Sequence, residues 1–228
     1  MPELGPLYTA VTEDAYECTV AVECCLFGFQ DNQLKILLVK RSIAPFQDSW
    51  VLPGGAMIEG KTLTESVNTV LDKLTGIKEI ALEQVACYSK VDRHPIKRVV
   101  SVSFYALVKP ENYPVIPRNY ISEIKWFDIL SVPELGFDHS KLLADSLSKL
   151  RENLRQNLVF GELLPDLFTL TELQELYENI LGEQFDRRNF RKKIMQMNLL
   201  TATDEKKQGV KGGPTLYKKN QTAQENSL

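Results

Sequence analysis

Residues 54–77 read GGAMIEGKTLTESVNTVLDKLTGI, and this stretch decides the fold because it predicts one well-bounded helix after a glycine pair. Thr62 and Glu65 have the spacing of a capping box, which begins a helix, and Gly76 ends it. Between these signals, apolar side chains recur at helical spacing: Leu63, Val67, Val70, Leu71 and Leu74. The stretch therefore predicts an amphipathic helix that packs one face against the rest of a domain.

Strand-like segments rich in Val, Ile and aromatic residues lie on both sides of this helix. They are TVAVECCLFGF (19–29) and KILLVK (35–40) before it, and QVACYSKV (84–91), RVVSVSFYALV (98–108) and IKWFDI (124–129) after it. The short loop between the first two segments is typical of a hairpin. Strands on both sides of one helix predict a mixed α/β domain.

The C-terminal part of the chain has a different pattern. Thr171 and Gln174 have capping-box spacing for a helix that ends at Gly182, and Asp186 caps a second helix, RRNFRKKIMQM. The segments NLLTAT and LYK are predicted strands that enclose a glycine-rich turn. Helix, turn, helix and hairpin in this order predict a winged helix.

The two patterns divide the chain into four regions. Residues 140–158 predict an amphipathic helix that either connects two domains or completes the first one. We expect an α/β domain over 1–140, a connecting helix over 141–158, a winged-helix domain over 159–220 and a disordered polar tail over 221–228.

Charge is distributed unevenly between these regions. Residues 187–219 contain ten Lys or Arg and two acidic residues, a net charge of +8. The rest of the chain contains 17 basic and 28 acidic residues, a net charge of −11. A basic end on an acidic body is expected when that end binds a polyanion.

The basic residues suit DNA recognition. In a helix-turn-helix the second helix enters the major groove, where Arg pairs with guanine and Asn with adenine, while a basic hairpin contacts phosphates. The predicted DNA-binding residues are Arg187, Arg188, Asn189, Arg191 and Lys192 on the helix, and Lys206, Lys207 and Lys211 on the hairpin. The alternative is a solvated basic helix in an ordinary helical subdomain.

Composition argues against several other classes of protein. The cysteines, at positions 18, 24, 25 and 87, lack metal-ligand spacing and are predicted to be reduced thiols packed in strands. His94 and His139 lie too far apart in the sequence to suggest a histidine site. We expect no metal and no cofactor. No apolar run is long enough to span a membrane, and the N-terminus has no export signal, so a cytoplasmic protein is expected.

Residues 54–77 also resemble the Nudix box, which reads Gly, five residues, Glu, seven residues, then Arg-Glu-apolar-x-Glu-Glu-x-Gly-apolar. The glycine and apolar positions of this pattern are matched by Gly55, Leu71, Gly76 and Ile77. The positions used for chemistry in that family hold Lys61, Thr69, Val70, Lys73 and Leu74 instead. Nudix hydrolases use carboxylates here to hold Mg²⁺ and orient water. The resemblance therefore implies a retained scaffold that is no longer an enzyme.

The resemblance continues along nearly the whole chain. The segments KILLVKRSIAPFQDSWVLPGG, VDRHPIKRVVSVSFYALV, LGFDHSKLL and FTLTELQELYENILG, followed by DRRNFRKKI, are similar to Nudix-related transcriptional regulators of the NrtR and AraR type. This implies a Nudix-like α/β/α sandwich that binds an effector, then a winged helix-turn-helix domain that binds double-stranded operator DNA in a homodimer. Effectors in the family are ADP-ribose-type nucleotides or L-arabinose, and the eroded box favours a sugar.

The resemblance also implies where an effector binds: between the glycine loop and the loop VDRHPIKR. Arg grips phosphate with two hydrogen bonds, and Asp with Arg binds sugar hydroxyls. The predicted effector-binding residues are Arg41, Gly54, Gly55, Glu59, Asp92, Arg93 and Arg98. For each side chain, a surface salt bridge is the alternative interpretation.

These features predict a ligand-responsive, DNA-binding transcriptional regulator in which the effector shifts the orientation of the two domains within a dimer. One alternative is a Nudix-type hydrolase of a nucleoside diphosphate derivative, with a non-standard metal site built from Glu59 and Glu65. Another is an adaptor whose basic domain binds an acidic protein.

Overall fold

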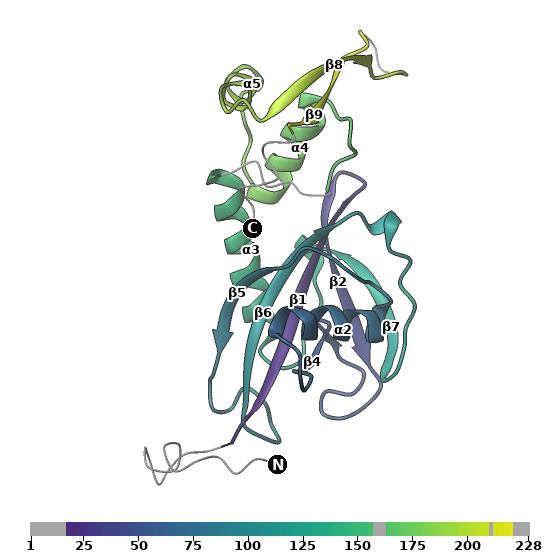
Figure 1. The fold of residues 1–228 in the computed structure, drawn as a ribbon, viewed down its shortest axis with the longest axis vertical. Coiled ribbons are helices and arrows are strands. Elements are labelled where there is room, and N and C mark those ends of the chain that lie inside the picture. The colour runs from purple at the N-terminus through teal and green to yellow at the C-terminus, as the bar shows by residue number, and fades with distance from the viewer. Residues whose placement is uncertain (1–16, 157–162, 210–211, 221–228) are drawn as a thin grey trace.

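The computed structural model describes residues 17–156, 163–209 and 212–220. An α/β domain and a smaller helical domain with a hairpin are joined by one long helix (Figure 1). The predicted tail over 221–228 lies outside the described residues.

Within the described residues, the larger sheet has seven strands. They are β1 Thr19–Gln30, β2 Gln33–Arg41, β3 Trp50–Val51, β4 Gly54–Ala56, β5 Glu83–Tyr88, β6 Val99–Val108 and β7 Ile121–Asp128. The strand order is β3-β2-β1-β6-β5, with β4 paired to β1 and β7 paired to β2. Only β1 and β6 pair in parallel; the other pairs are antiparallel, including the predicted β1–β2 hairpin.

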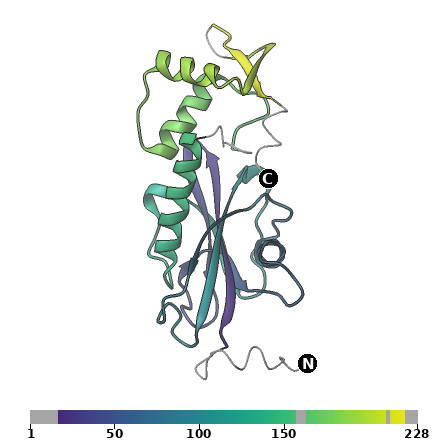
Figure 2. The same ribbon diagram turned by 60° about the vertical axis from the view of Figure 1, so that its left-hand side comes forward.

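The central strand β1 is buried on both faces, which explains its almost continuous apolar sequence. Alternate residues point to opposite sides of a strand. Val22, Cys24 and Leu26 belong to the core shared with α2 (Leu63–Thr75), whereas Cys25 and Phe27 belong to the core shared with α3 (His139–Gln156). The sheet lies between these helices (Figure 2), so the predicted α/β/α sandwich is confirmed.

Helix α2 begins and ends where its sequence predicts. The Thr62 hydroxyl accepts the Glu65 amide hydrogen, and the Glu65 carboxylate accepts the Thr62 amide hydrogen at 2.7 Å. Gly76 ends the helix at φ +85°, a left-handed conformation that glycine adopts without strain. Both ends are therefore fixed by local hydrogen bonds, independently of any ligand.

The C-terminal domain contains α4 (Leu170–Leu181), α5 (Arg187–Gln196), β8 (Leu200–Lys206) and β9 (Thr215–Lys219), so the winged-helix prediction is confirmed. The predicted capping box of α4 was wrong by two residues. Thr169 caps the helix with Glu172, and the helix includes Leu170, which is buried. Burial of that apolar side chain favours the earlier start.

The hairpin is attached to the start of α4. Phe168 and Tyr217 exchange backbone hydrogen bonds of 3.1 and 2.7 Å. The Lys207 ammonium contacts the Glu172 carboxylate at 2.5 Å. Burial acts to raise the pKa of Glu172, but hydrogen bonds from Lys207 and Thr169 outweigh it, so this pKa is lowered. One carboxylate therefore caps α4 and anchors the hairpin.

Both domains share one hydrophobic core. Helix α3 packs Leu142 and Leu150 against the sheet, and the same buried cluster continues through Phe168 and Leu173 to Ile194 of α5. Two polar contacts reinforce this connection: the Arg151 side chain donates to the Ile180 carbonyl at 2.7 Å, and Arg155 pairs with Glu183 at 2.6 Å. The helix expected to connect the domains therefore also packs on the sheet.

Two short strands, β3 and β4, were not expected from the sequence. Both are three residues or fewer, too short to show an alternating pattern. The prediction that all four cysteines pack in strands holds for Cys24 and Cys25, which are buried, but not for Cys18 and Cys87, which are exposed. Within the part of the chain that the structure describes, no helix is both long and apolar enough to cross a membrane.

We expect Leu150→Ala to lower the free energy of unfolding by about 2–5 kcal/mol, because Leu150 is fully buried where α3 meets both domains. Chemical denaturation would measure this. Leu130→Ala is the control, since Leu130 is 89% exposed and its loss should change stability by less than about 0.5 kcal/mol. Equal effects of the two substitutions would contradict a shared core around α3.

Candidate functional site

A cavity of about 180 Å³ opens beside β1 and β4. Its walls come from the end of β2, the loop after β5, the start of β7 and the residues that lead into α3. Its polar lining residues are Thr19, Glu23, Arg41, Arg93, His94, Lys97, Tyr120 and His139. Segments from several distant parts of the sequence therefore converge on one hollow, which is the usual form of a small-molecule site.

A buried ion pair forms one wall of this cavity. The Arg93 guanidinium donates from Nε to Oδ2 of Asp138 at 2.9 Å and from Nη2 to Oδ1 at 2.8 Å. Its Nη2 atom also lies 3.9 Å from Oε1 of Glu23. The Arg93 side chain is 3% exposed and the Asp138 side chain 23% exposed, so the guanidinium is buried while the carboxylate keeps some access to water. It joins the loop after β5 to the residue that precedes α3.

Glu23 is a buried acid with one oxygen unused. Its Oε2 atom has no hydrogen-bond partner among the described residues. Burial raises the pKa of Glu23 from 4.5 to about 8, with Arg93 opposing the rise and Asp138 adding to it. The carboxyl group is therefore mostly protonated at neutral pH, in a residue that lines the cavity. A single Glu within a strand gives no sequence signal for this role.

Gly54 allows the close packing at this wall. A Cβ atom at Gly54 would lie 2.7 Å from Cγ of Glu23 and 2.7 Å from the Val22 carbonyl oxygen. The Tyr120 hydroxyl donates to the Gly54 carbonyl at 3.2 Å, which holds the loop against β7. The glycine pair that precedes α2 therefore shapes the cavity through its lack of side chains.

Arg41 lies between two aromatic rings. Its guanidinium carbon is 5.5 Å from the ring centroids of both Tyr120 and Phe137, and its Nε donates to the Pro45 carbonyl at 2.8 Å. Burial lowers the pKa of Arg41, with Tyr120 opposing the change, but an arginine remains charged at neutral pH. Arg41 therefore presents a fixed cation flanked by flat apolar surfaces.

The two histidines, which are far apart in the sequence, both lie against one aromatic ring and line the cavity. The Phe137 ring stacks 5.4 Å from His94 and 5.2 Å from His139. His139 accepts the Leu52 amide hydrogen on Nδ1 at 3.0 Å. Burial, reinforced by the charges of Arg93 and Arg41, lowers the pKa of His139 to about 3. His139 is therefore a neutral part of the wall.

The structure brings together four of the seven predicted effector-binding residues: Arg41, Gly54, Gly55 and Arg93 line the cavity. Glu59 and Asp92 are exposed and lie outside its lining. Asp92 pairs with Lys90 at 3.0 Å, because both side chains of that turn face solvent. Arg98 is half-buried and also lies outside the lining, and its Nη1 has no partner within the described ranges.

The positions of the Nudix box do not fit a divalent cation. Lys61 donates to the Thr69 hydroxyl at 2.7 Å, and Val70 and Leu74 are buried in the core. Glu65 is used as the cap of α2. Among the described residues, no three His, Cys, Asp or Glu side chains are grouped as metal ligands. Magnesium needs several convergent oxygens, which this chain does not offer here.

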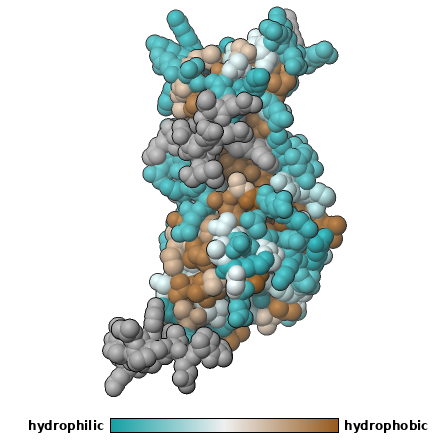
Figure 3. Space-filling model, in the orientation of Figure 1, coloured by the Kyte–Doolittle hydropathy of each residue, from teal (hydrophilic) through white to brown (hydrophobic). Residues whose placement is uncertain are grey.

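The predicted DNA-binding residues lie at the opposite end of the molecule, where hydrophilic side chains gather around α5 and the hairpin (Figure 3). Helix α5 buries Phe190 and Ile194 and exposes the predicted basic face: Arg187, Arg188, Asn189, Arg191 and Lys192. On the hairpin, Lys206 is exposed, Lys207 is held by Glu172, and Lys211 lies outside the described residues.

Comparisons with known proteins identify two family models that match this chain. Residues 19–146 match the model of the NUDIX domain, and residues 160–218 match the model of the NrtR DNA-binding winged helix domain. The chain is 33% identical to the "ADPR responsive transcriptional repressor NtrR" of Acinetobacter baylyi over 202 residues, which cover 87% of this chain and 81% of the relative. It is 31% identical over 118 residues to an ADP-ribose pyrophosphatase of Methanocaldococcus jannaschii, covering 52% of this chain and 69% of that enzyme.

Two solved structures of Shewanella oneidensis NrtR are also similar. One, complexed with a 27mer DNA, has a TM-score of 0.77 and 32% identity, covering 88% of this chain and 93% of that one. The other, its NUDIX domain complexed with ADP ribose, has a TM-score of 0.55 and 30% identity, covering 63% of this chain and 97% of that one.

The fold and the basic helix define a transcriptional regulator with a Nudix domain and a DNA-binding winged helix. The chain belongs to the NrtR family of these regulators. The sequence-based preference for an arabinose-like sugar is not supported, because these relatives are named for ADP-ribose.

We expect Glu23→Gln to gain stability relative to the unsubstituted protein as pH rises from about 4.5 to about 8. A raised folded-state pKa means that the neutral acid stabilises the fold at low pH, and that this contribution is lost as the acid ionises. The gain should be on the order of a few kcal/mol. Urea denaturation of both proteins at pH 4.5 and pH 8.5 would measure it. An equal stability difference at both pH values would contradict a buried neutral carboxyl.

Proposed function

We propose that this protein is an ADP-ribose-responsive repressor that binds operator DNA as a dimer and releases it when the nucleotide binds. The observation that carries the effector assignment is the charge of the cavity. Arg41, Arg93 and Lys97 line it, and the single lining carboxyl among the described residues, Glu23, is mostly protonated at neutral pH. Such a lining suits an anionic ligand, as do the names of the relatives.

A neutral sugar fits this lining less well than a nucleotide. Sugar sites place carboxylate and amide groups opposite hydroxyls, whereas here the three cations Arg41, Arg93 and Lys97 line the hollow, and Glu23 is mostly protonated at neutral pH. The rings of Tyr120, Phe137 and His94 add flat surfaces suited to stacking on a base or packing on a ribose. Cations beside aromatic rings suit a ligand that combines phosphates with a planar base.

Helix α3 is suited to couple the cavity to the DNA-binding domain. At the N-terminal end of α3, Asp138 accepts two hydrogen bonds from Arg93, and His139 lines the cavity. At its other end, Arg151 and Arg155 bind the last turn of α4 and the residues that follow it. An effector that competes with Asp138 for Arg93 would free the start of α3. The movement would then reach α4, which packs against the DNA-reading helix.

Hydrolysis of the nucleotide is not part of the proposed function, because Lys61, Val70, Lys73 and Leu74 replace the residues that hold metal in Nudix hydrolases. Incubation with ADP-ribose and Mg²⁺ should leave the nucleotide intact. Turnover abolished by Glu59→Gln or Glu65→Gln would instead favour the hydrolase.

We expect Arg188→Ala to weaken operator binding by about 5- to 150-fold, the loss of about 1–3 kcal/mol that follows removal of a base contact. Fluorescence anisotropy with duplexes from upstream of the protein's own gene, against scrambled DNA, would measure this. Because Arg188 is exposed, thermal unfolding should not change. Lys149→Ala removes a cation from α3, which is not part of the basic face of α5, and should keep full affinity. Unchanged binding by Arg188→Ala would contradict the assignment of α5 as the reading helix.

We expect Arg41→Ala to weaken ADP-ribose binding by 10-fold or more, because a charged hydrogen bond contributes about 1.5–3 kcal/mol. Isothermal titration calorimetry would measure the affinity. Operator binding without nucleotide should be kept, but more ADP-ribose should be needed to release the DNA. Lys90→Ala removes a cation from the neighbouring loop outside the cavity and should behave like the unsubstituted protein. Release of DNA by L-arabinose and not by ADP-ribose would overturn the effector assignment.

A further inference from the structure

A second hollow adjoins the cavity on the side of α2. Four residues line both: Gly55, Ala56, Leu74 and Tyr120. The hollow continues past them to Val70, Lys73 and Asn119. The two hollows therefore meet at these four residues, where the glycine loop lies against α2.

Lys73 is the charged residue that lines this hollow among the described residues, and its ammonium group can bind a ligand. The Asn119 amide donates to the Lys73 carbonyl at 2.6 Å, and the Tyr120 hydroxyl donates to the Gly54 carbonyl, so both of these polar groups are already engaged. Within the described ranges, no hydrogen bond or ion pair engages the Lys73 ammonium, and its side chain is exposed. The rest of the lining is glycine and apolar side chains.

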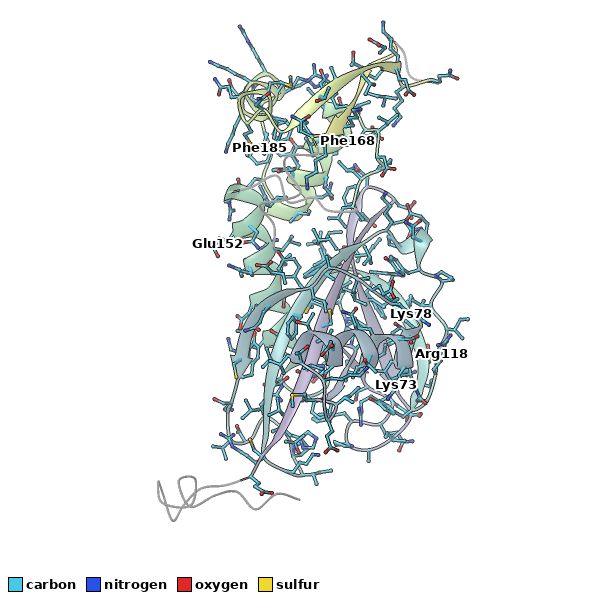
Figure 4. All side chains as sticks on the ribbon, viewed as in Figure 1. Lys73, Lys78, Arg118, Glu152, Phe168 and Phe185 are labelled. Atoms are coloured by element: carbon cyan, nitrogen blue, oxygen red, sulfur yellow. The ribbon has the colours of Figure 1, made fainter. Side chains whose placement is uncertain are left out.

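The acidic residue next to Lys73 does not neutralise this hollow. Asp72 lies 3.5 Å from the Lys78 ammonium and 3.7 Å from the Arg118 guanidinium, so its carboxylate already has two cationic partners. Lys73 and Lys78 lie on opposite sides of α2 (Figure 4). Among the described residues, no carboxylate lines the second hollow. A divalent cation would find no ligand set here, whereas an anion would find a cation in a largely apolar recess.

We propose that Lys73 binds the diphosphate of the effector directly, so that this protein holds the nucleotide without a divalent metal. This inference rests on the proposed function for the identity of the nucleotide. Lys73 occupies a position where the Nudix box has a metal-binding glutamate. Replacing that carboxylate by an ammonium exchanges a negative group, which needs a metal to bind phosphate, for a positive group that does not.

The exchange suits sensing rather than turnover. A single ammonium attracts phosphate oxygens but does not activate a bound water molecule as a metal does. The nucleotide would therefore remain intact in the site. Its occupancy would follow the concentration of the nucleotide and not the concentration of free Mg²⁺.

Isothermal titration calorimetry of the full chain tests this inference. ADP-ribose is titrated in EDTA and again in excess MgCl₂, and the affinities should agree within about twofold. Lys73→Gln should weaken binding by about 10- to 100-fold, as expected for loss of a charged contact. Lys78→Gln, at the same end of α2 but outside both hollows, should keep full affinity. Thermal unfolding checks that both variants are folded.

The outcomes separate this inference from the proposed function. Binding of ADP-ribose only with Mg²⁺, or equal affinities of the Lys73→Gln and Lys78→Gln variants, would overturn the metal-free site and leave the effector assignment standing. Inorganic pyrophosphate, titrated in EDTA, is the second probe. If it binds through Lys73 while ADP-ribose does not bind, the anion site is supported and the nucleotide assignment fails. Binding of neither ligand would overturn both.

Discussion

The arrangement of the cavity depends on the paired hydrogen bonds between Arg93 and Asp138. Both groups are charged and largely removed from water, so loss of either one would leave the other uncompensated at a cost of about 3–5 kcal/mol. The pair fixes the loop after β5 against the residue that begins α3, and this brings Phe137 and His139 into the wall. The same pair holds the Arg93 guanidinium near the Glu23 carboxyl group. The shape and the electrostatics of the site therefore have one origin.

The Nudix scaffold persists here although the positions used for chemistry in the family have changed, and two of them, Val70 and Leu74, are packed in the core. Helix α2 is fixed by the Thr62–Glu65 cap and by the packing of Val67 and Leu71, none of which has to hold a metal. Two of the positions used for chemistry in the family, Lys61 and Thr69, are instead joined by a hydrogen bond at the start of this helix. A fold can therefore be kept while its function moves from catalysis to recognition.

The sequence was sufficient for β1, α2 and α5, which have a strong period or cap, and for the basic face of α5, but it placed the cap of α4 two residues too late. It missed β3 and β4, which are too short to have a period. For the cavity, it identified Arg41 and Arg93 but could not show that Asp138 would pair with one of them across 45 residues. It also missed Glu23 and the stacked histidines, because burial and proximity arise only when distant segments meet.

The shared core limits how the two domains can move. Because Leu150, Phe168 and Leu173 belong to one buried cluster, the two domains pack against each other and do not move independently. Separating them would expose apolar surface to water, so a change in their orientation must occur as sliding of packed helices from one interlocked arrangement to another. A packed interface of this kind has few stable arrangements. The protein would therefore switch between discrete domain orientations and would not change orientation continuously.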